Sequence, residues 1–207
     1  ATEGTDYGSL SDITISAGAT TGTTTFTPTD DSMYETSTDE TATVAIDTVS
    51  GGSATENGTQ AVTITINENE SAPSVTLSVS ASSIAENSGS TLTITATSSI
   101  VADENITVGI STSGTATEGT DYGTISDITI SAGATTGTAT LDPTDDNIYE
   151  DDETATIDIS SVSGKSGVTE NGTQQVSVTI AENESAPTVT LATSATSIAE
   201  NAGTSLT

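Results

Sequence analysis

The chain has 207 residues, of which 30 are Asp or Glu and only one is Lys or Arg, so its formal net charge is −29. This charge excludes nucleic-acid binding by phosphate neutralisation and disfavours contact with anionic lipid, and it indicates a cation as the natural partner. Cysteine and histidine are absent, which excludes disulfides and zinc–thiolate sites and leaves hard oxygen atoms as metal ligands. No apolar run reaches the roughly 18 to 20 residues of a membrane span, so we expect no direct membrane insertion.

Internal repeats set the domain organisation. The motif "ATEGTDYG" begins at Ala1 and Ala116, and "ENESAP" begins at Glu68 and Glu182, a spacing of 182−68=114. A unit above 100 residues can bury its own core, so this long period predicts tandem modules and not a solenoid. We predict a partial repeat at 1–72 that lacks its first strands, a complete repeat at 73–185, and the first strands of a further repeat at 186–207. The start at Ala1, without a signal-like segment, suggests part of a longer protein.

Apolar residues alternate with polar ones along the complete repeat. In chain order, this period of two predicts half-buried strands around 75–79, 92–96, 106–110, 128–130, 155–159 and 176–180. Segments rich in Gly and Ser, such as 131–137 and 163–167, predict turns. No segment has a helical period. About seven short strands in such a unit predict an all-β fold, an immunoglobulin-like antiparallel β-sandwich.

The predicted core is thin, because the chain has only one Phe and four Tyr and must rely on aliphatic side chains that bury less area each. Tyr7 and Tyr122 follow an Asp, and Tyr34 and Tyr149 precede a Glu. We expect these rings to pack under loops and assign them no role in stacking on a ligand.

Acidic residues concentrate in "TDDNIYEDDET" at 144–154 and in "TDDSMYETSTDET" at 29–41. The first copy is two residues longer within this segment, which predicts a loop. Two carboxylates about 4 Å apart repel by roughly 4 kcal/mol at an effective dielectric constant of 20, so a converging cluster needs a counter-ion. Ca²⁺ accepts six to eight oxygen ligands in flexible geometry. The residues alone leave two interpretations open, a calcium site and a solvated acidic loop.

A family resemblance favours the calcium site. The succession of "SIAENSG" (83–89), "GTATEGTDYG" (114–123), "DDNIYEDDE" (145–153) and "VTIAENE" (178–184) resembles the Calx-beta domain over the whole complete repeat. The resemblance implies a seven-stranded Ca²⁺-binding sandwich. Such domains occur in sodium–calcium exchangers, in an integrin subunit, and in tandem arrays on large extracellular and bacterial surface proteins.

By position, the resemblance implies metal ligands from four segments that meet at one end of the sandwich. In the complete repeat they are Glu86, Asp121, Asp145, Asp146, Glu150, Glu153, Glu182, Asn183 and Glu184, with a backbone carbonyl near Ile148. The preceding repeat offers Asp6, Asp30, Asp31, Glu35, Glu40, Glu68 and Glu70, without a counterpart of Glu86. High-affinity members carry three Asp where this chain has Glu182-Asn183-Glu184, which leaves the number of ions and their affinity open.

The predicted function is a calcium-binding structural module of a secreted or cell-surface, adhesin-like protein. The "ENESAP" joints place proposed ligands directly before the next repeat without a flexible Gly/Ser linker, so bound ions would stiffen the contact between neighbouring repeats. Two alternatives stay open: a Ca²⁺ sensor of a membrane transporter, and direct binding of a cell-surface or matrix ligand. We predict no enzyme activity, because His and Cys are absent and the single Lys lies in a Gly/Ser turn.

Overall fold

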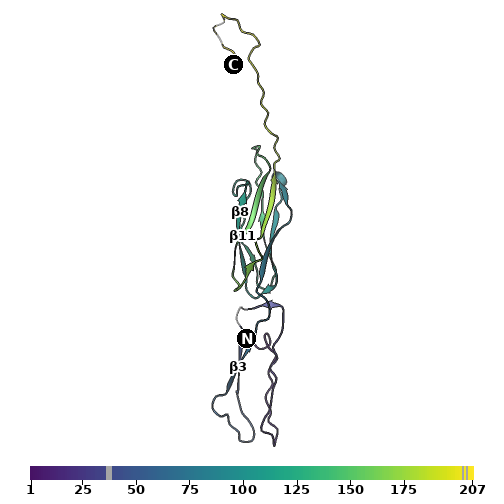
Figure 1. Ribbon diagram of the computed structural model, residues 1–207, viewed down its shortest axis with the longest axis vertical. Coiled ribbons are helices and arrows are strands. Elements are labelled where there is room, and N and C mark those ends of the chain that lie inside the picture. Colours follow the sequence, from purple (N-terminus) through teal and green to yellow (C-terminus); the bar gives the residue numbers. More distant parts are fainter. Residues whose placement is uncertain (36–38, 202, 204) are drawn as a thin grey trace.

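The structure of the protein is a computed structural model, described here for residues 1–35, 39–201, 203 and 205–207. Figure 1 shows three parts that follow one another along the long axis: the first repeat, a β-sandwich, and an extended C-terminal segment. Among the described residues, no helix has the length and apolar character needed to cross a membrane.

Two sheets form the sandwich. The first has the strand order β10–β6–β4–β12 and consists of β4 (Ser74–Val79), β6 (Leu92–Ser98), β10 (Thr136–Leu141) and β12 (Thr169–Glu170). The second has the order β5–β13–β11–β8–β9 and consists of β5 (Ser83–Ala85), β8 (Ile106–Gly114), β9 (Ile128–Ile130), β11 (Glu153–Ser163) and β13 (Gln175–Ala181). The long strands pair antiparallel, whereas the short β5 and β12 run parallel to β13 and β4. The predicted all-β sandwich is confirmed.

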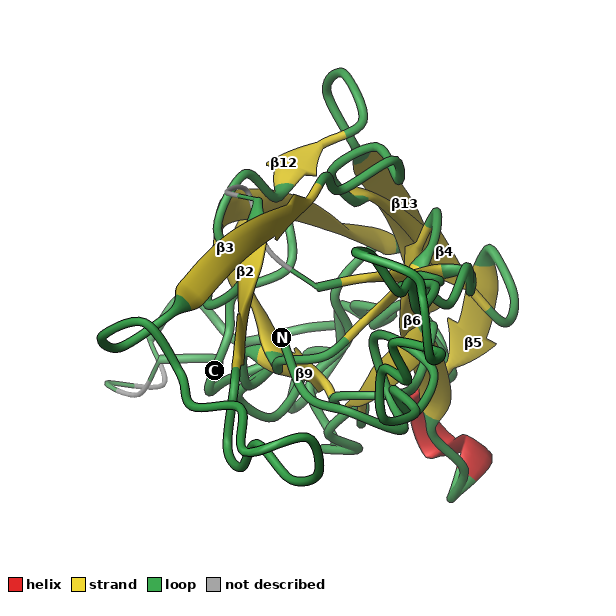
Figure 2. Ribbon diagram, turned by 90° about the horizontal axis from the view of Figure 1, so that it is seen from below, coloured by secondary structure: helices red, strands yellow, loops and turns green. Residues whose placement is uncertain are grey.

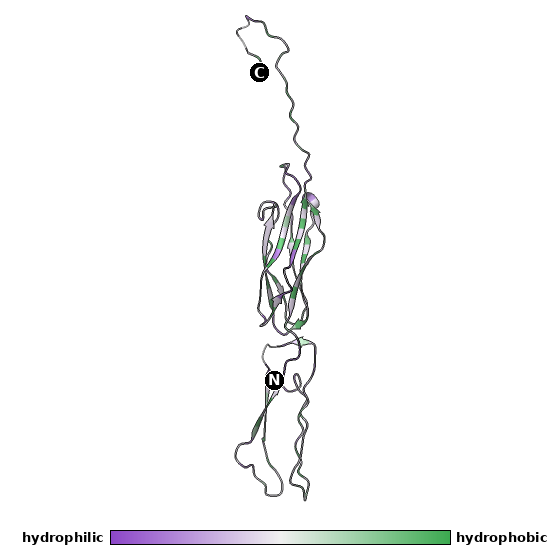
Figure 3. Ribbon diagram, viewed as in Figure 1, coloured by the Kyte–Doolittle hydropathy of each residue, from purple (hydrophilic) through white to green (hydrophobic). Residues whose placement is uncertain are grey.

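The alternating sequence pattern explains which residues enter the core. Val75 of β4, Ile94 of β6 and Ile157 of β11 are all 0% exposed, and apolar colour concentrates on the sandwich strands (Figure 3). All six predicted strand segments are strands. The predicted turn at 131–137 is too long by two residues, because β10 already begins at Thr136.

One cluster of buried residues, between Val75 and Ile180 in sequence, forms the core of the sandwich. Tyr122 is its only aromatic member among the described residues, which confirms the predicted thin core. Because every member lies within the complete repeat, this repeat closes its own core and can fold independently of its neighbours. Tyr34 and Tyr122 are buried, as expected, but the expectation is wrong for Tyr149, which is 40% exposed at the tip of its loop.

The first repeat forms β1 (Met33–Tyr34), β2 (Glu40–Ala45) and β3 (Ala61–Ile66). Strands β2 and β3 make an antiparallel pair, and Tyr7 stacks on Phe26 with ring centroids 4.6 Å apart. Its apolar residues are poorly covered: Ile13 and Ile15 are 55% and 58% exposed. The repeat lacks the strands that would face them, so no second layer buries this surface.

The C-terminal segment 186–207 extends away from the sandwich (Figure 1) and contains no strand among its described residues. Val189 and Leu191 are almost fully exposed. Among the described residues of this segment the predicted strands are absent, because no partner strand lies beside them.

Candidate metal centre

The first group of converging carboxylates follows directly from strand pairing. β5 runs parallel to β13 with Ala85 opposite Ala181, so the next residue of each strand, Glu86 and Glu182, leaves the sheet at the same edge. Glu86 opens the single-turn 3-10 helix η1 (Glu86–Ser88), drawn red in Figure 2. Carboxylate oxygens of Glu86, Glu182 and Glu184 all lie within 4.8 Å of one another. We call this group the strand-end triad.

The second group, the loop triad, consists of Asp121, Glu150 and Glu153, whose carboxylate oxygens also lie within 4.8 Å of one another. Glu153 is the first residue of β11 and pairs with Ile180 of β13, which places it beside the strand-end triad. Asp121 is fixed by its own turn, where its Oδ2 accepts the N–H of Thr117 at 2.6 Å.

Gly114 brings the segment that carries Asp121 close to β11. Its φ is +119°, and a Cβ atom at this position would lie 2.0 Å from the carbonyl oxygen of Thr154. That carbonyl instead accepts the N–H groups of Thr115 and Ala116, at 2.9 and 3.1 Å. Only glycine permits both the positive φ and this approach of the two backbones.

The acidic loop between β10 and β11 ties the two triads together through its backbone. The N–H of Asp146 donates to Glu86 Oε1 at 3.2 Å, and the N–H of Glu150 donates to Glu182 Oε2. The N–H of Glu182 in turn donates to Asp152 Oδ1 at 3.0 Å. The loop is therefore folded over the end of the sandwich and is not merely solvated.

The pKa values reflect an excess of negative charge. Burial, followed by the hydrogen bond to Asp121, raises the pKa of Glu153 to about 7. Burial also raises the pKa of Glu86 and Glu150. Glu182 is the exception, because N–H groups of Glu184 and Glu150 stabilise its charged form and lower its pKa to about 2. Glu86, Glu150 and Glu153 thus lose their protons less readily than usual, next to a Glu182 that is ionised. This pattern is expected where several carboxylates lie together without a positive charge.

The donor set fits a hard cation. Every side-chain ligand offered by the two triads is a carboxylate oxygen, the type that Ca²⁺ prefers. Oε1 of Glu184 accepts a hydrogen bond from Asn183 Nδ2 at 2.7 Å, whereas its Oε2 is buried without a hydrogen-bond donor in the described structure. The contact with the Glu182 side chain, followed by burial, raises the pKa of Glu184. A buried oxygen of this kind is costly unless a ligand meets it.

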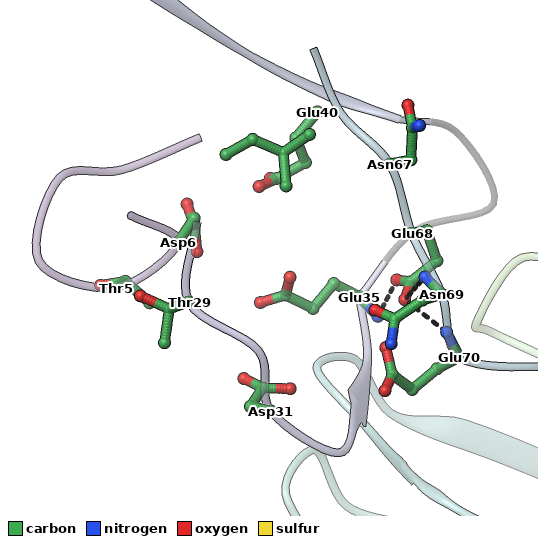
Figure 4. Close-up of a pocket in the computed structure, with 11 residues that line it drawn as sticks. Thr5, Asp6, Thr29, Asp31, Glu35, Glu40, Asn67, Glu68, Asn69 and Glu70 are labelled. Atoms are coloured by element: carbon green, nitrogen blue, oxygen red, sulfur yellow. Dashed lines mark hydrogen bonds between the residues drawn. The ribbon is translucent and has the colours of Figure 1, made fainter. Parts of the chain in front are cut away.

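The first repeat contains a counterpart of the loop triad. Oxygens of Asp6, Glu35 and Glu40 lie within 4.8 Å of one another and point toward one space in a polar pocket (Figure 4). These residues match Asp121, Glu150 and Glu153 in sequence order, although the first copy is two residues longer between its two Glu. Residues 36–38 of that longer segment lie outside the described residues. The N–H of Glu35 donates to Glu68 Oε2 at 3.0 Å, as that of Glu150 does to Glu182, and burial raises the pKa of Glu35.

The remaining predicted ligands lie outside the triads. Asp146 and Asp31 accept the N–H groups of Ile148 and Met33, at 2.6 and 2.7 Å. Asp30 accepts Asn69 Nδ2 at 3.1 Å, and Glu70 donates its N–H to Glu68. Asp145 is exposed, and the side chain of Ile148 is 62% exposed. Sequence reasoning missed Asp152, which binds the N–H of Glu182; its place within the acidic segment was the available signal.

The fold and the site together define a class of protein: tandem acidic β-sandwich repeats with clustered carboxylates at the end of the module. The Calx-beta domain model matches residues 1–70 and 68–184, and the chain belongs to the Calx-beta family.

Two solved structures are similar to parts of the chain. The apo-form Calx CBD1 domain is 21% identical, with a TM-score of 0.44 over 54% of this chain and 98% of that one. CBD12 from CALX1.2 is 22% identical, with a TM-score of 0.41 over 48% of this chain and 40% of that one. A comparison with curated proteins found no match.

Proposed function

We propose that the complete repeat binds Ca²⁺ between its strand-end and loop triads. In this proposal, bound ions rigidify a secreted or cell-surface, adhesin-like protein that is built from such repeats and has a structural, non-catalytic role. One observation carries the proposal: six carboxylates from separate segments converge where the chain leaves the sandwich toward the next repeat, and Glu184 Oε2 among them is buried and unpaired in the described structure.

The carboxylates of the two triads differ in how readily they are ionised. Glu182, with its pKa of about 2, carries its charge at any physiological pH. Glu153, with its pKa of about 7, is partly protonated near neutral pH and would bind a cation only in its ionised form. A bound Ca²⁺ supplies the positive charge that offsets repulsion among these carboxylates. Calcium and protons therefore compete for the loop triad near neutral pH.

Calcium binding at this end of the sandwich would also affect the connection between one repeat and the next. Glu184 lies two residues before Ala186-Pro187, and the proline ring restricts its own φ and the conformation of the preceding residue. Once a bound cation fixes the positions of the carboxylates, the segment after Pro187 can leave the sandwich in only a few directions. Filled sites would thus extend and stiffen an array of repeats.

Isothermal titration calorimetry of the chelator-stripped chain with CaCl₂ tests the proposal. A structural module of an extracellular protein needs a dissociation constant of only about 10⁻⁴ to 10⁻³ M. Asp121→Asn is expected to weaken binding at the complete repeat by about tenfold or more, since one charged ligand is lost. Glu104→Gln removes an exposed charge far from the triads and should leave the titration unchanged.

Two outcomes would redirect the proposal. Equal heats for the unmodified chain and Asp121→Asn would show that the acidic residues attract only a diffuse ion cloud. Micromolar affinity, with a maximum dimension in small-angle scattering that changes over the same calcium range, would favour a Ca²⁺ sensor of a membrane transporter instead.

A further inference from the structure

The acidic loop of the first repeat docks onto the second repeat. Met33 and Tyr34 form β1, which pairs in parallel with β7 (Val101–Ala102), with Tyr34 opposite Ala102. The N–H of Asp103 donates to the carbonyl oxygen of Tyr34 at 3.3 Å, and only 3% of Tyr34 is exposed. We call Met33–Tyr34 the plug, and we call Val101–Asp103 with Lys165 and Gly167 the socket.

The only basic side chain of the sequence holds this plug. Lys165 is 5% exposed, pairs with the carboxylate of Asp103, and donates to the backbone carbonyl of Glu35. Its Nζ lies 5.5 Å from the centroid of the Tyr34 ring, a distance at which a cation attracts the aromatic face. Burial of the single cation of a chain with charge −29 needs these three partners.

Gly167 makes room for the tyrosine. Its φ is +79°, and a Cβ atom there would lie 3.0 Å from Tyr34 Oη and 3.2 Å from Ala72 Cβ. The socket therefore has room for the phenol ring of a tyrosine from the acidic loop of the preceding repeat.

The second repeat presents the same plug without a cover. The N–H of Ile148 donates to Asp146 at 2.6 Å, just as that of Met33 donates to Asp31 at 2.7 Å. The loop is thus shaped alike in both repeats, but Ile148 and Tyr149 are 62% and 40% exposed. The Tyr149 hydroxyl donates to Asp151 Oδ1 at 3.1 Å, but among the described residues nothing covers its ring as the second repeat covers that of Tyr34, which is 3% exposed.

We propose that Ile148–Tyr149 docks into the socket of a further repeat of the same kind, with Tyr149 under the lysine of that repeat. The occupant follows from the chain itself, because Ala186-Pro187 repeats the Ala72-Pro73 joint. Val189 and Leu191, the counterparts of the buried Val75 and Leu77, are 96% and 102% exposed, so the start of a further repeat is present here without a facing layer. The contact itself uses no metal ion, and measuring it in chelator as well as in CaCl₂ separates its failure from a failure of calcium binding.

The test uses a longer chain in which a second copy of residues 72–185 replaces residues 186–207; this unit contains a complete core of its own. The added copy carries Tyr149→Phe, so that the peptide containing Tyr149 occurs once in the longer chain. Tyrosine nitration by tetranitromethane, measured by peptide mass spectrometry in chelator and in CaCl₂, then reports the burial of this tyrosine. The nitration rate of Tyr149 is expected to fall about tenfold, as its exposure falls from 40% toward the 3% of Tyr34. Lys165→Met in the added copy alone should restore part of the rate.

Equal nitration of Tyr149 in the original and longer chains would overturn the proposal. A second measurement needs no added repeat: in the 207-residue chain, Lys165→Met should increase nitration of Tyr34, while Tyr122, which is 1% exposed in the core, stays protected. A protected Tyr34 in this variant would equally refute the role of the lysine in the socket.

Discussion

The substitution Glu153→Gln should stabilise the calcium-free protein near neutral pH. Burial and the contact with Asp121 raise the pKa of Glu153 from 4.5 to about 7. The folded state therefore retains, between these two pH values, a proton that the unfolded chain has released. The free energy of unfolding of the calcium-free protein falls as pH rises through this window. The glutamine side chain of the variant has no proton to lose, so this part of the pH dependence disappears.

The size of the effect follows from the pKa. The difference between about 7 and 4.5 sets an upper limit of about 3.4 kcal/mol. Glu153 is half-buried, and solvent screening reduces the expected gain to about 1–2 kcal/mol. For the 185−73+1=113 residues of the complete repeat, an unfolding entropy of about 2.1 cal/mol/K per residue converts this gain to a rise in Tm of roughly 4–8 °C.

Scanning calorimetry in chelator, at about pH 4, below the unfolded-state pKa, and at about pH 7.5, measures this difference. The melting temperatures of the two proteins should nearly coincide at the lower pH and separate at the higher one. Glu104→Gln controls for the loss of one negative charge, because this exposed residue lies at the other end of the module. Saturating CaCl₂ should stabilise the unmodified chain more than the variant, which has lost a ligand. Parallel pH profiles for the unmodified chain and Glu153→Gln would refute the reasoning.

Three further predictions concern the other end of the pH range, the joint and the core. Glu182→Gln should lower the Tm even in chelator, because three backbone N–H groups donate to this carboxylate. The pKa of Glu182 is lowered from 4.5 to about 2, so the unmodified chain should lose stability as pH falls through this range, which circular dichroism measures. Lys165→Met should increase proteolysis at the joint between the two repeats in limited digestion, and an unchanged cleavage pattern would contradict the buried contact with Tyr34. Tyr122→Ala should destabilise the sandwich by about 3–5 kcal/mol in urea unfolding, whereas Tyr149→Ala, at an exposed tip, should stay within about 0.5 kcal/mol of the parent.

The ligand groups were only partly predictable. The resemblance indicated all six residues of the two triads and a meeting at one end of the sandwich. The division into two groups of three depends on tertiary contacts such as the parallel pairing of β5 with β13, which leaves no trace in local sequence patterns. The same holds for the joint: Tyr34 and Lys165 are 165−34=131 residues apart in sequence, and nothing near either residue signals the other. Tertiary contacts of this kind depend on how whole modules stack.

Within the complete repeat, the sequence by itself determined where the strands lie, because a period of two gives each segment one apolar face. Only the tertiary structure decided whether that face is buried. Ile128 and Ile130 are 0% and 1% exposed, while Ile13 and Ile15 occupy the same motif in the first repeat and are more than half exposed. The two copies share the motif, but only the second copy has a facing sheet. A strand can bury apolar area only where a second layer packs against it.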